Sequence, residues 1–463
     1  MRAFTDLRPP PVVAASYSPR TGNSVDLLVD GQESFGRIFG AIENARNSVW
    51  ITVSFVDLGM EIRRRSCTLL DLLDAVAGRG IDVRLLFWWS EYRGVGSFRG
   101  DDHELEMLTA RACQVKMRWD RVPGGCHHQK SYVIDEEAAF VGGINLTPDG
   151  MSSPAHGGDG FHDLFAELRG PSVADVAHNF LQRWNGATET LSRGHAWPSR
   201  SEAGELDAAV PASPEAGSST VQVVRTIRRG LYSGGQGWHD GHRFDLEEGE
   251  YSVRDAVLAA IDSAESSIYI ENQYLIDTRT ITFLGLAARR GVEVIVVVPV
   301  DPDPNLLLYP EKKMAVTKRA LAELAVEKNL GLFGLRRSRN DGSSVPEANI
   351  YVHSKLLIVD ESFMSIGSAN LWPPSYHRDS EMNLLIWDAT LARSTRDRLW
   401  REHLGGSGSR SLGDWLELAT PTADGPNKRG GGRVRAVRLD PRHYYDFGAV
   451  VVAPWAGARR ADP

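Results

Sequence analysis

The chain has 463 residues and an ordinary globular composition, with 42% hydrophobic, 24% charged and 8% aromatic residues. This composition excludes wholesale disorder, a coiled coil and a collagen-like fibre. The length predicts more than one domain, because a single core rarely grows beyond about 300 residues. A net charge of −8 argues against a global attraction to nucleic acid or anionic lipid, and three cysteines are too few for a disulfide framework.

In chain order, the first regular elements alternate between helical and strand patterns. Residues 35–42 carry apolar side chains at helical spacing, and VWITVSF, 49–55, follows as a strand. LLDLLDAVAGRG, 69–80, predicts a second helix that ends at glycine, before the strand IDVRLLFWW, 81–89. The same alternation returns from residue 253 onward. Helices that alternate with apolar strands indicate an α/β fold with a largely parallel sheet.

The repeated alternation is an internal duplication. AIENARNSVWITVSF, which begins at Ala41, matches AIDSAESSIYIENQY, which begins at Ala260. HQKSYVID, which begins at His128, matches HSKLLIVD, which begins at His353. Because the matched segments keep their order and only the loops change length, we predict two similar halves.

The domain boundaries follow from the matched segments and from composition. We place the first half at 1–197 and the second at 220–405. Residues 198–219 are rich in Pro, Ala, Ser and Glu and are expected to be an exposed linker. The tail, 406–463, is expected to pack on the core.

No export signal or membrane span is visible. The N-terminal apolar run VVAA is too short for the core of a signal peptide. The most apolar later stretch, VEVIVVVPV at 292–300, falls far short of the about 20 residues that a membrane helix needs. We expect a cytoplasmic protein without a transmembrane segment, and leave open peripheral membrane contact and export without a signal.

The chemistry-bearing residues lie in a doubled motif, His-x-Lys-x-x-x-x-Asp. Its copies are His128, Lys130, Asp135 and His353, Lys355, Asp360, and each copy is followed by a Gly-x-x-Asn segment. Two such copies at matched positions are very improbable by chance. Strand alternation places the histidine and the lysine of each copy on the same face.

These segments resemble the phospholipase D superfamily over nearly all of residues 20–405. HHQKSYVIDEEAAFVGGIN and IYVHSKLLIVDESFMSIGSAN look like its two HKD motifs. IYIENQYL, QVVRT, FHD, LWREHL and NLWPPSYHRDSE resemble the true phospholipases D. The resemblance implies two pseudo-symmetric α/β/α halves, each with a mixed, largely parallel sheet flanked by helices, and an active site at their interface.

The residue types suit attack on a phosphodiester. An imidazole with a pKa near ~6.5 can act as a nucleophile and as an acid, and lysine and amide groups can stabilise the anionic oxygens. The resemblance implies that His128 forms a phosphohistidine and that His353 protonates the leaving alcohol. It also implies that Asp379 supports His128 and Asp163 supports His353; we pair these two aspartates at an offset of 216.

The candidate catalytic residues are therefore His128, Lys130, Asp135, Asp163, His353, Lys355, Asp360 and Asp379, of which Asp135 and Asp360 are taken as structural members of the motif. The candidate substrate-binding residues are Gly143, Asn145, Ser368 and Asn370. No metal or other cofactor is required, because two ammonium groups can take the place of a divalent ion.

Three functions compete for this site. The first is a phospholipase D that hydrolyses phosphatidylcholine-like lipids to phosphatidate and a head-group alcohol, with transphosphatidylation to other alcohols. The second is a cardiolipin-synthase-type phosphatidyltransferase, and the third is a phosphodiesterase or nuclease. The net charge and the absence of a basic stripe argue against nucleic acid as a partner. We expect a monomer that meets phospholipid at a membrane or micelle surface.

Overall fold

The computed structural model describes residues 13, 16–62, 67–88, 106–107, 110–111, 113–120, 122, 124–153, 156, 160–186, 206, 212–231, 238–239, 242–243, 246, 248–337, 348–406, 411–421 and 434–446. Most of the predicted linker, and the parts of the tail at 407–410, 422–433 and 447–463, lie outside these ranges. None of the described helices is long and apolar enough to cross a membrane.

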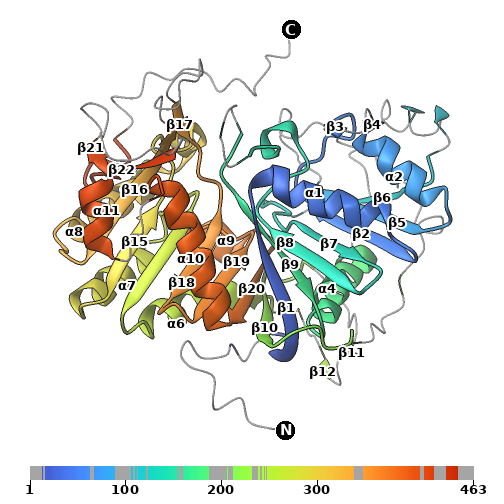
Figure 1. The fold of residues 1–463 in the computed structure, drawn as a ribbon, viewed down its shortest axis with the longest axis horizontal. Coiled ribbons are helices and arrows are strands. Elements are labelled where there is room, and N and C mark those ends of the chain that lie inside the picture. The colour runs from blue at the N-terminus through green and yellow to red at the C-terminus, as the bar shows by residue number, and fades with distance from the viewer. Residues whose placement is uncertain are drawn as a thin grey trace.

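Two sheets with the same strand order lie side by side (Figure 1). The first has the order β6-β5-β2-β7-β8-β9-β1. Its strands are β1 (Arg20–Val29), β2 (Ser48–Val53), β5 (Asp82–Trp88), β6 (Lys116–Asp120), β7 (Ser131–Ile134), β8 (Ala138–Gly142) and β9 (Leu164–Arg169). The second has the order β16-β15-β14-β18-β19-β20-β10. Its strands are β10 (Ser219–Ile227), β14 (Ser267–Asn272), β15 (Glu293–Val297), β16 (Leu330–Arg337), β18 (Lys355–Val359), β19 (Phe363–Gly367) and β20 (Glu381–Trp387). The repeated sequence segments therefore correspond to two sheets with the same topology.

Both sheets are mixed. Parallel pairing joins β2, β5 and β6 in the first sheet and β14, β15 and β16 in the second. The remaining neighbours pair antiparallel. The parallel part is thus limited to three strands of each sheet, because the motif strand of each half runs antiparallel to the central strand and then turns back in a tight hairpin.

Those hairpin turns explain the aspartate of each motif. Asp135 and Asp360 both have positive φ, and so does the glutamate that follows each of them, which is the backbone conformation that tight hairpin turns favour. The Asp135 carboxylate accepts the backbone N–H groups of residues 46–48, and the Asp360 carboxylate accepts those of 265–267, at 2.7–3.1 Å. Both aspartates therefore hold the helix-to-strand connection before the central strand, at the end of the motif strand away from its histidine.

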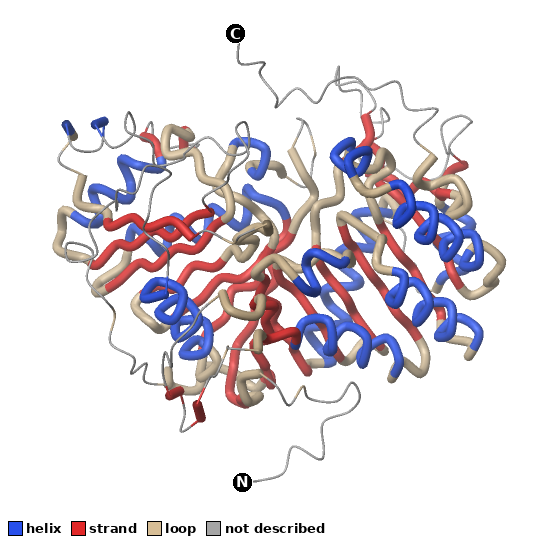
Figure 2. Tube along the Cα trace, turned by 180° about the vertical axis from the view of Figure 1, so that it is seen from behind, coloured by secondary structure: helices blue, strands red, loops and turns tan. Residues whose placement is uncertain are grey.

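Helices cover both faces of the sheets (Figures 1 and 2). In the first half these are α1 (Asp30–Glu43), α2 (Leu69–Ala77) and α4 (Val173–Gly186); in the second they are α6 (Ser252–Asp262), α7 (Thr278–Arg289), α8 (Glu311–Leu324), α9 (Pro373–His377), α10 (Ala389–His403) and α11 (Leu412–Leu418). Short elements complete the described chain: β3 (Glu61–Ile62), β4 (Cys67–Thr68), β11 (Trp238–His239), β12 (His242–Arg243), β13 (Glu250–Tyr251), β17 (Ala348–Ile350), β21 (Thr420–Pro421), β22 (Val434–Leu439), η1 (Pro148–Gly150) and η2 (Pro304–Leu308).

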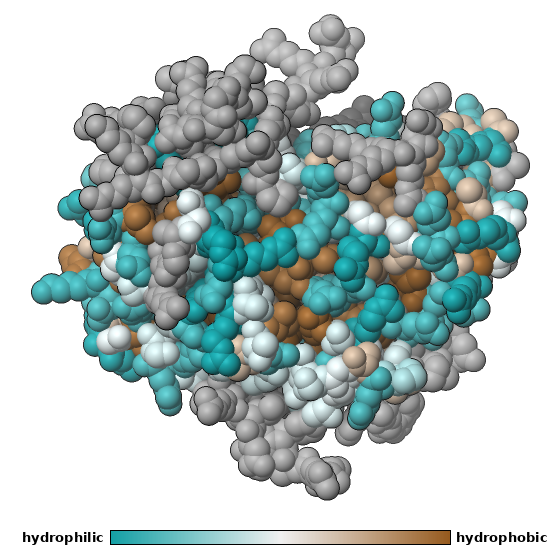
Figure 3. Space-filling view, in the orientation of Figure 1, coloured by the Kyte–Doolittle hydropathy of each residue, from teal (hydrophilic) through white to brown (hydrophobic). Residues whose placement is uncertain are grey.

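The halves share one hydrophobic core. Apolar side chains of α4, α10 and α11 and of both sheets form a single buried cluster. Two further clusters lie under α1 and α2 and under α6, α7 and α8. β1 also pairs with β10, which joins the two sheets directly, and β22 of the tail pairs with β16. In the space-filling view most of the described surface on this face is hydrophilic, and apolar residues gather mainly in the middle (Figure 3).

Candidate active site

Each motif histidine lies where a strand of its own half begins and where the other half approaches it. His128 precedes β7, and its backbone N–H donates to the carbonyl of Ser380 at 2.9 Å. His353 precedes β18, and its N–H donates to the carbonyl of His162 at 2.8 Å. Each histidine is therefore held by the segment that leads into a strand of the opposite half, so the two motifs meet between the halves.

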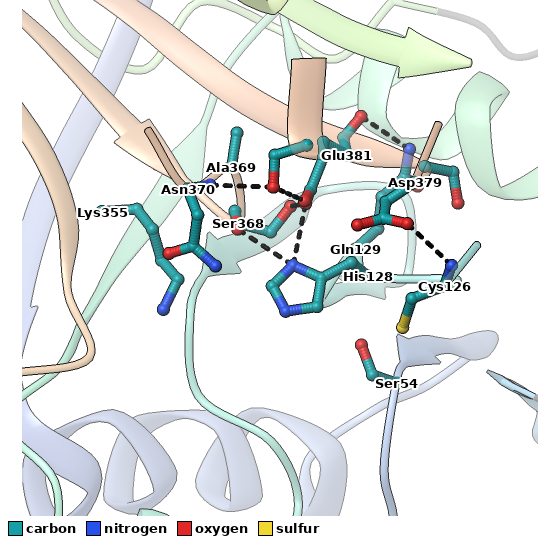
Figure 4. Close-up of polar contacts among 12 residues, drawn as sticks. Ser54, Cys126, His128, Gln129, Lys355, Ser368, Ala369, Asn370, Asp379 and Glu381 are labelled. Carbon is teal, nitrogen blue, oxygen red and sulfur yellow. Dashed lines mark hydrogen bonds and ion pairs between the residues drawn. The ribbon is translucent and has the colours of Figure 1, made fainter. Parts of the chain in front are cut away.

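His128 is supported by a carboxylate that the sequence analysis did not assign. Its Nδ1 lies 3.0 Å from Glu381 Oε2 and 3.1 Å from the carbonyl of Ser368 (Figure 4). Both partners are acceptors, which places the proton of the imidazole on Nδ1. The Ser368 and Ser375 hydroxyls donate to Glu381 at 2.5 and 2.6 Å. These contacts orient the ring and leave Nε2 free to react.

The expected contact between Asp379 and His128 is not present. The Asp379 carboxylate instead accepts the N–H of Cys126 at 2.9 Å (Figure 4). The sheet register shows why. Gly142 lies opposite Phe165, and its equivalent Gly367 lies opposite Asn383, an offset of 218. The true counterpart of Asp163 is therefore Glu381, two residues beyond Asp379, and a shift of two residues keeps the same strand face.

His353 has the predicted neighbour. Its Nδ1 lies 2.5 Å from Asp163 Oδ2, across the interface. The backbone N–H of Leu164 donates to the other carboxylate oxygen at 2.7 Å. Gly143 lies directly behind this carboxylate, because a Cβ on it would stand 2.4 Å from Asp163 Oδ1. Glycine at this position therefore makes room for the carboxylate that supports His353.

The two lysines occupy equivalent positions. Lys130 Nζ donates to the Ser54 hydroxyl at 3.0 Å and to the His128 carbonyl at 2.7 Å. Lys355 Nζ lies 3.4 Å from Gln273 Oε1 and also contacts its own histidine. Ser54 and Gln273 follow the matched central strands β2 and β14. Both ammonium groups are nearly fully buried, so they form a positive centre that is poorly screened by water.

The remaining candidate residues also lie around this centre. Asn370 Nδ2 donates to Gln273 Oε1 at 3.2 Å, which leaves its second N–H for a ligand. Asn145 Oδ1 accepts the N–H of Phe55 at 3.3 Å. Ser368 is fully buried, and its hydroxyl is engaged with Glu381. Gly143 and Ser368 thus stand behind the supporting carboxylates, whereas the two asparagines adjoin the lysine side.

Burial and like charges perturb the ionisation of the site. Burial lowers the pKa of Lys130 to about 8 and that of Lys355 to about 7. Burial also lowers the pKa of His128, against the opposing effect of Glu381. The pKa of His353 falls further, because the positive charges of Lys355 and Lys130 add to burial. Such strongly perturbed groups clustered at one position are typical of reactive sites.

A second buried network lies behind His353. His162 has one ring nitrogen 3.0 Å from Asp30 and the other 3.0 Å from Glu271, and His403 donates to Glu271 at 2.8 Å. Burial opposes protonation of His162, but Glu271 and Asp30 outweigh it and raise its pKa well above the usual range. The residue types could hold a metal ion, but the groups already pair with one another. The network ties the halves together immediately before Asp163.

Comparison with known families finds a match in each half of the chain. A family model described as cardiolipin synthase, PLD-like domain, matches residues 38–184 and 257–402, one range in each half and more than half of the chain. The chain belongs to the phospholipase D superfamily. A further model, described as phospholipase D, matches residues 157–281.

Individual relatives of this phospholipase D superfamily member are distant. Phospholipase D A of Dictyostelium discoideum is 25% identical over 84% of this chain and 36% of its own length. Cardiolipin synthase 1 of Staphylococcus epidermidis is 25% identical over 81% and 66%, and cardiolipin synthase B of Escherichia coli is 26% identical over 82% and 80%. The chain thus spans about a third of the first relative and two thirds of the second.

A solved structure shares the fold. The crystal structure of phosphatidylserine synthase from Haemophilus influenzae matches with a TM-score of 0.56 and 15% identity, over 86% of this chain and 89% of that chain. At this identity the likeness shows the fold alone.

Sequence reasoning missed three members of the site: Glu381, Ser54 and Gln273. Two of them, Ser54 and Gln273, lie in segments that the duplication already marks. Ser54 and Gln273 share the offset of 219 that relates the matched strands. Glu381 required the register of β19 against β20, because the loop before it has no counterpart of equal length in the first half.

Proposed function

We propose that this protein is a phospholipase D that transfers the phosphatidyl group of a phosphatidylcholine-like phospholipid to water. The observation that carries the proposal is the pair of histidines, each with its Nδ1 against a buried carboxylate and two buried lysines beside them. This arrangement offers one nucleophile, one acid and a positive centre for a phosphate.

In the proposed first step, Nε2 of His128 attacks phosphorus and the bond from phosphorus to the head-group oxygen breaks. His353 gives its Nε2 proton to the departing alcohol, and Asp163 stabilises the imidazolium from which that proton comes. The phosphate anion offsets the charge of Lys130 and Lys355, so substrate binding raises the pKa of His353 toward that of a useful acid.

In the second step, His353 takes a proton from water, and the resulting oxygen attacks the phosphohistidine. The bond from phosphorus to nitrogen breaks, phosphatidate leaves, and His128 is regenerated. Lys130, Lys355, Asn145 and Asn370 stabilise the charge on the non-bridging oxygens in both steps. An alcohol in place of water gives transphosphatidylation.

A second candidate is transfer to the hydroxyl of phosphatidylglycerol, which gives cardiolipin. The match of both halves to a model described as cardiolipin synthase, PLD-like domain, favours it, as do relatives that carry that name. The chemistry of the site is the same, and only the acceptor differs. Peripheral association with a membrane is part of both proposals.

The deciding experiment offers phosphatidylcholine, phosphatidylglycerol and single-stranded DNA separately, with and without EDTA, and identifies the products by mass spectrometry. We expect phosphatidate and choline from phosphatidylcholine, with activity retained in EDTA. If phosphatidylglycerol is converted to cardiolipin and little phosphatidate forms, the second candidate is established. Cleavage of DNA alone would refute both, and His128→Ala is the control in every arm.

A further inference from the structure

An exposed apolar loop follows the second strand of the parallel group in the second half. Leu307 and Leu308 end η2, which follows β15, and their side chains are 54% and 87% exposed. Val316, in the second turn of α8, is 54% exposed. Scattered apolar residues on a surface are normal, but two adjacent leucines at this exposure, followed along the chain by a third exposed apolar side chain, suggest a contact surface.

This loop borders the candidate active site. Lys355 pairs with Asn272 at the carboxyl end of β14, and β15 runs parallel to β14. The segment after β15 therefore leaves the sheet at the edge where the motif lies.

Direct contacts confirm that placement. Asp303, the N-cap of η2, accepts hydrogen bonds from the hydroxyls of Tyr274 at 2.6 Å and Tyr351 at 3.3 Å. The ring of Tyr351 lies 6.3 Å from that of His353. One aromatic side chain thus separates the base of the loop from the imidazole.

The apolar residues are accompanied by positive charge. Lys312, Val316 and Arg319 follow one another along one face of α8, at the spacing of one helical turn. Lys312, Lys313 and Arg319 are exposed and form no ion pair with the other described residues. The chain as a whole carries −8, so this cluster is a local exception that suits an anionic interface.

We propose that Leu307, Leu308, Lys312, Lys313, Val316 and Arg319 form a docking lip for an anionic phospholipid surface. The leucines enter the boundary between head groups and acyl chains, and the cations contact lipid phosphates. Apolar side chains beside basic ones are the combination that binds such interfaces reversibly. The biological meaning of the lip rests on the proposed function, because docking here presents lipid head groups to the adjoining site.

The chain offers a matched control. Val326 is 75% exposed and follows the other end of α8, about 10–20 Å along the helix from the α8 residues of the lip at 1.5 Å per residue. Its charged neighbours along the chain are Glu323, Glu327 and Lys328, rather than a group of cations alone. If any loss of exposed apolar surface weakened binding, whatever its position, Val326→Ser would lower vesicle affinity as much as Leu308→Ser.

The test is co-sedimentation with vesicles of phosphatidylcholine alone or with phosphatidylglycerol, using full-length protein that also carries His128→Ala, so that lipid is not consumed. We expect Leu307→Ser/Leu308→Ser to lower vesicle affinity at least about tenfold, since burying one leucine is worth about that much. Lys312→Gln/Lys313→Gln should weaken binding several-fold only when phosphatidylglycerol is present. Val326→Ser should change affinity less than twofold.

Activity measurements separate this proposal from the proposed function. In an otherwise wild-type background, the leucine variant should retain turnover of a short-chain phospholipid below its micelle concentration while losing turnover on vesicles. Vesicle binding without any phospholipid turnover would contradict the proposed function but not the proposal of a docking lip. Equal vesicle affinity for the leucine variant and the parent would overturn the lip.

Two other occupants of this surface make distinct predictions. If the lip covers a second copy of the chain, the leucine variant converts a dimer to a monomer in light scattering without a change in vesicle affinity. If the chain after Asp446 covers it, a protein ending at Asp446 binds vesicles much more tightly than the parent; Asp446 pairs with Lys318 of α8 at 2.7 Å. Either result replaces the proposal.

Discussion

The two histidine sites come from one duplicated motif but are supported differently. Nδ1 of His128 meets Glu381, whose carboxylate is held by serine hydroxyls. Nδ1 of His353 meets the shorter Asp163, whose carboxylate is held by a backbone N–H and backed by glycine. The duplication thus preserved the reacting groups and their geometry while the supporting residues diverged.

The immediate surroundings differ as well. The ring of Phe161 stacks on His353 at 5.3 Å, and the sheet register places Asp379 at the equivalent position in the other half. The His353 side chain is 8% exposed against 16% for His128. A more buried imidazole beside two ammonium groups resists protonation until an anion arrives. We infer unequal roles, and the following experiments test that inequality.

The largest effects should come from the histidines themselves. His128→Ala and His353→Ala should each lower turnover by several orders of magnitude, because general acid catalysis alone is worth ~10²–10⁴-fold. With a p-nitrophenyl phosphodiester, whose leaving group needs no proton, His353→Ala should still form a phospho-enzyme and then stall. His128→Ala should form none.

The measurement is an alkaline quench followed by peptide mapping by mass spectrometry. Phosphate on the peptide that contains His353 would reverse the assigned roles. Wild-type turnover with no label on either peptide would indicate direct attack by water.

The next largest effect should come from Glu381, the carboxylate that contacts His128, and a smaller one from Asp379. Glu381→Gln should lower kcat about 10²-fold, because the amide cannot stabilise an imidazolium as the carboxylate does. Asp379→Asn should cost less than about tenfold, since its carboxylate contacts the Cys126 N–H and not the ring. Steady-state kinetics on a soluble phosphodiester compare the two. A larger loss for Asp379→Asn would restore the pairing expected from the sequence.

Substitution of Gly143 and of Ser368, which lie behind the two supporting carboxylates, should lower kcat to different extents. Gly143→Ala places a methyl group 2.4 Å from Asp163 Oδ1, so the carboxylate must move and kcat should fall at least about tenfold. Ser368→Ala removes one hydrogen bond to Glu381 and should cost a few-fold. Thermal unfolding of both variants checks that the fold is intact. Near-parent activity of Gly143→Ala would show that the position of Asp163 is unimportant.

The pH profile should be narrow. Catalysis needs His128 neutral, both lysines protonated and His353 protonated once the substrate phosphate is bound. The value of kcat/KM should therefore rise through the histidine range below about 6.5 and fall as Lys355, with a pKa of about 7, loses its proton. The alkaline limb of kcat should lie higher, because bound phosphate stabilises the ammonium. Lys355→Arg should move the alkaline limb of kcat/KM upward in whatever activity remains. An unchanged limb would assign it to another group.

The smallest effects on activity should come from the motif aspartates. Asp135→Asn and Asp360→Asn weaken charge-assisted bonds to three backbone N–H groups each, so each should lower stability by about 1–3 kcal/mol. Turnover per folded molecule should stay within a few-fold. Denaturant unfolding combined with active-site titration distinguishes this outcome from a direct catalytic role.

Much of this protein could be read from the sequence, because the decisive signals are local. Apolar periodicity predicts the alternating elements, and the repeated segments predict two equivalent halves. The paired His-x-Lys spacing places both groups on one strand face. These patterns depend only on neighbouring residues, so they need no knowledge of where distant segments meet.

Tertiary structure alone decided which carboxylate serves which histidine. Asp379 lies in the bend before β20 and Glu381 is the first residue of that strand. Only the pairing of β19 with β20 determines which of them reaches His128. It also decided that parallel pairing stops after three strands of each sheet, and that Ser54 and Gln273 face the lysines. Such contacts join residues far apart in the chain, and a shift of two residues leaves strand periodicity unchanged while exchanging every partner.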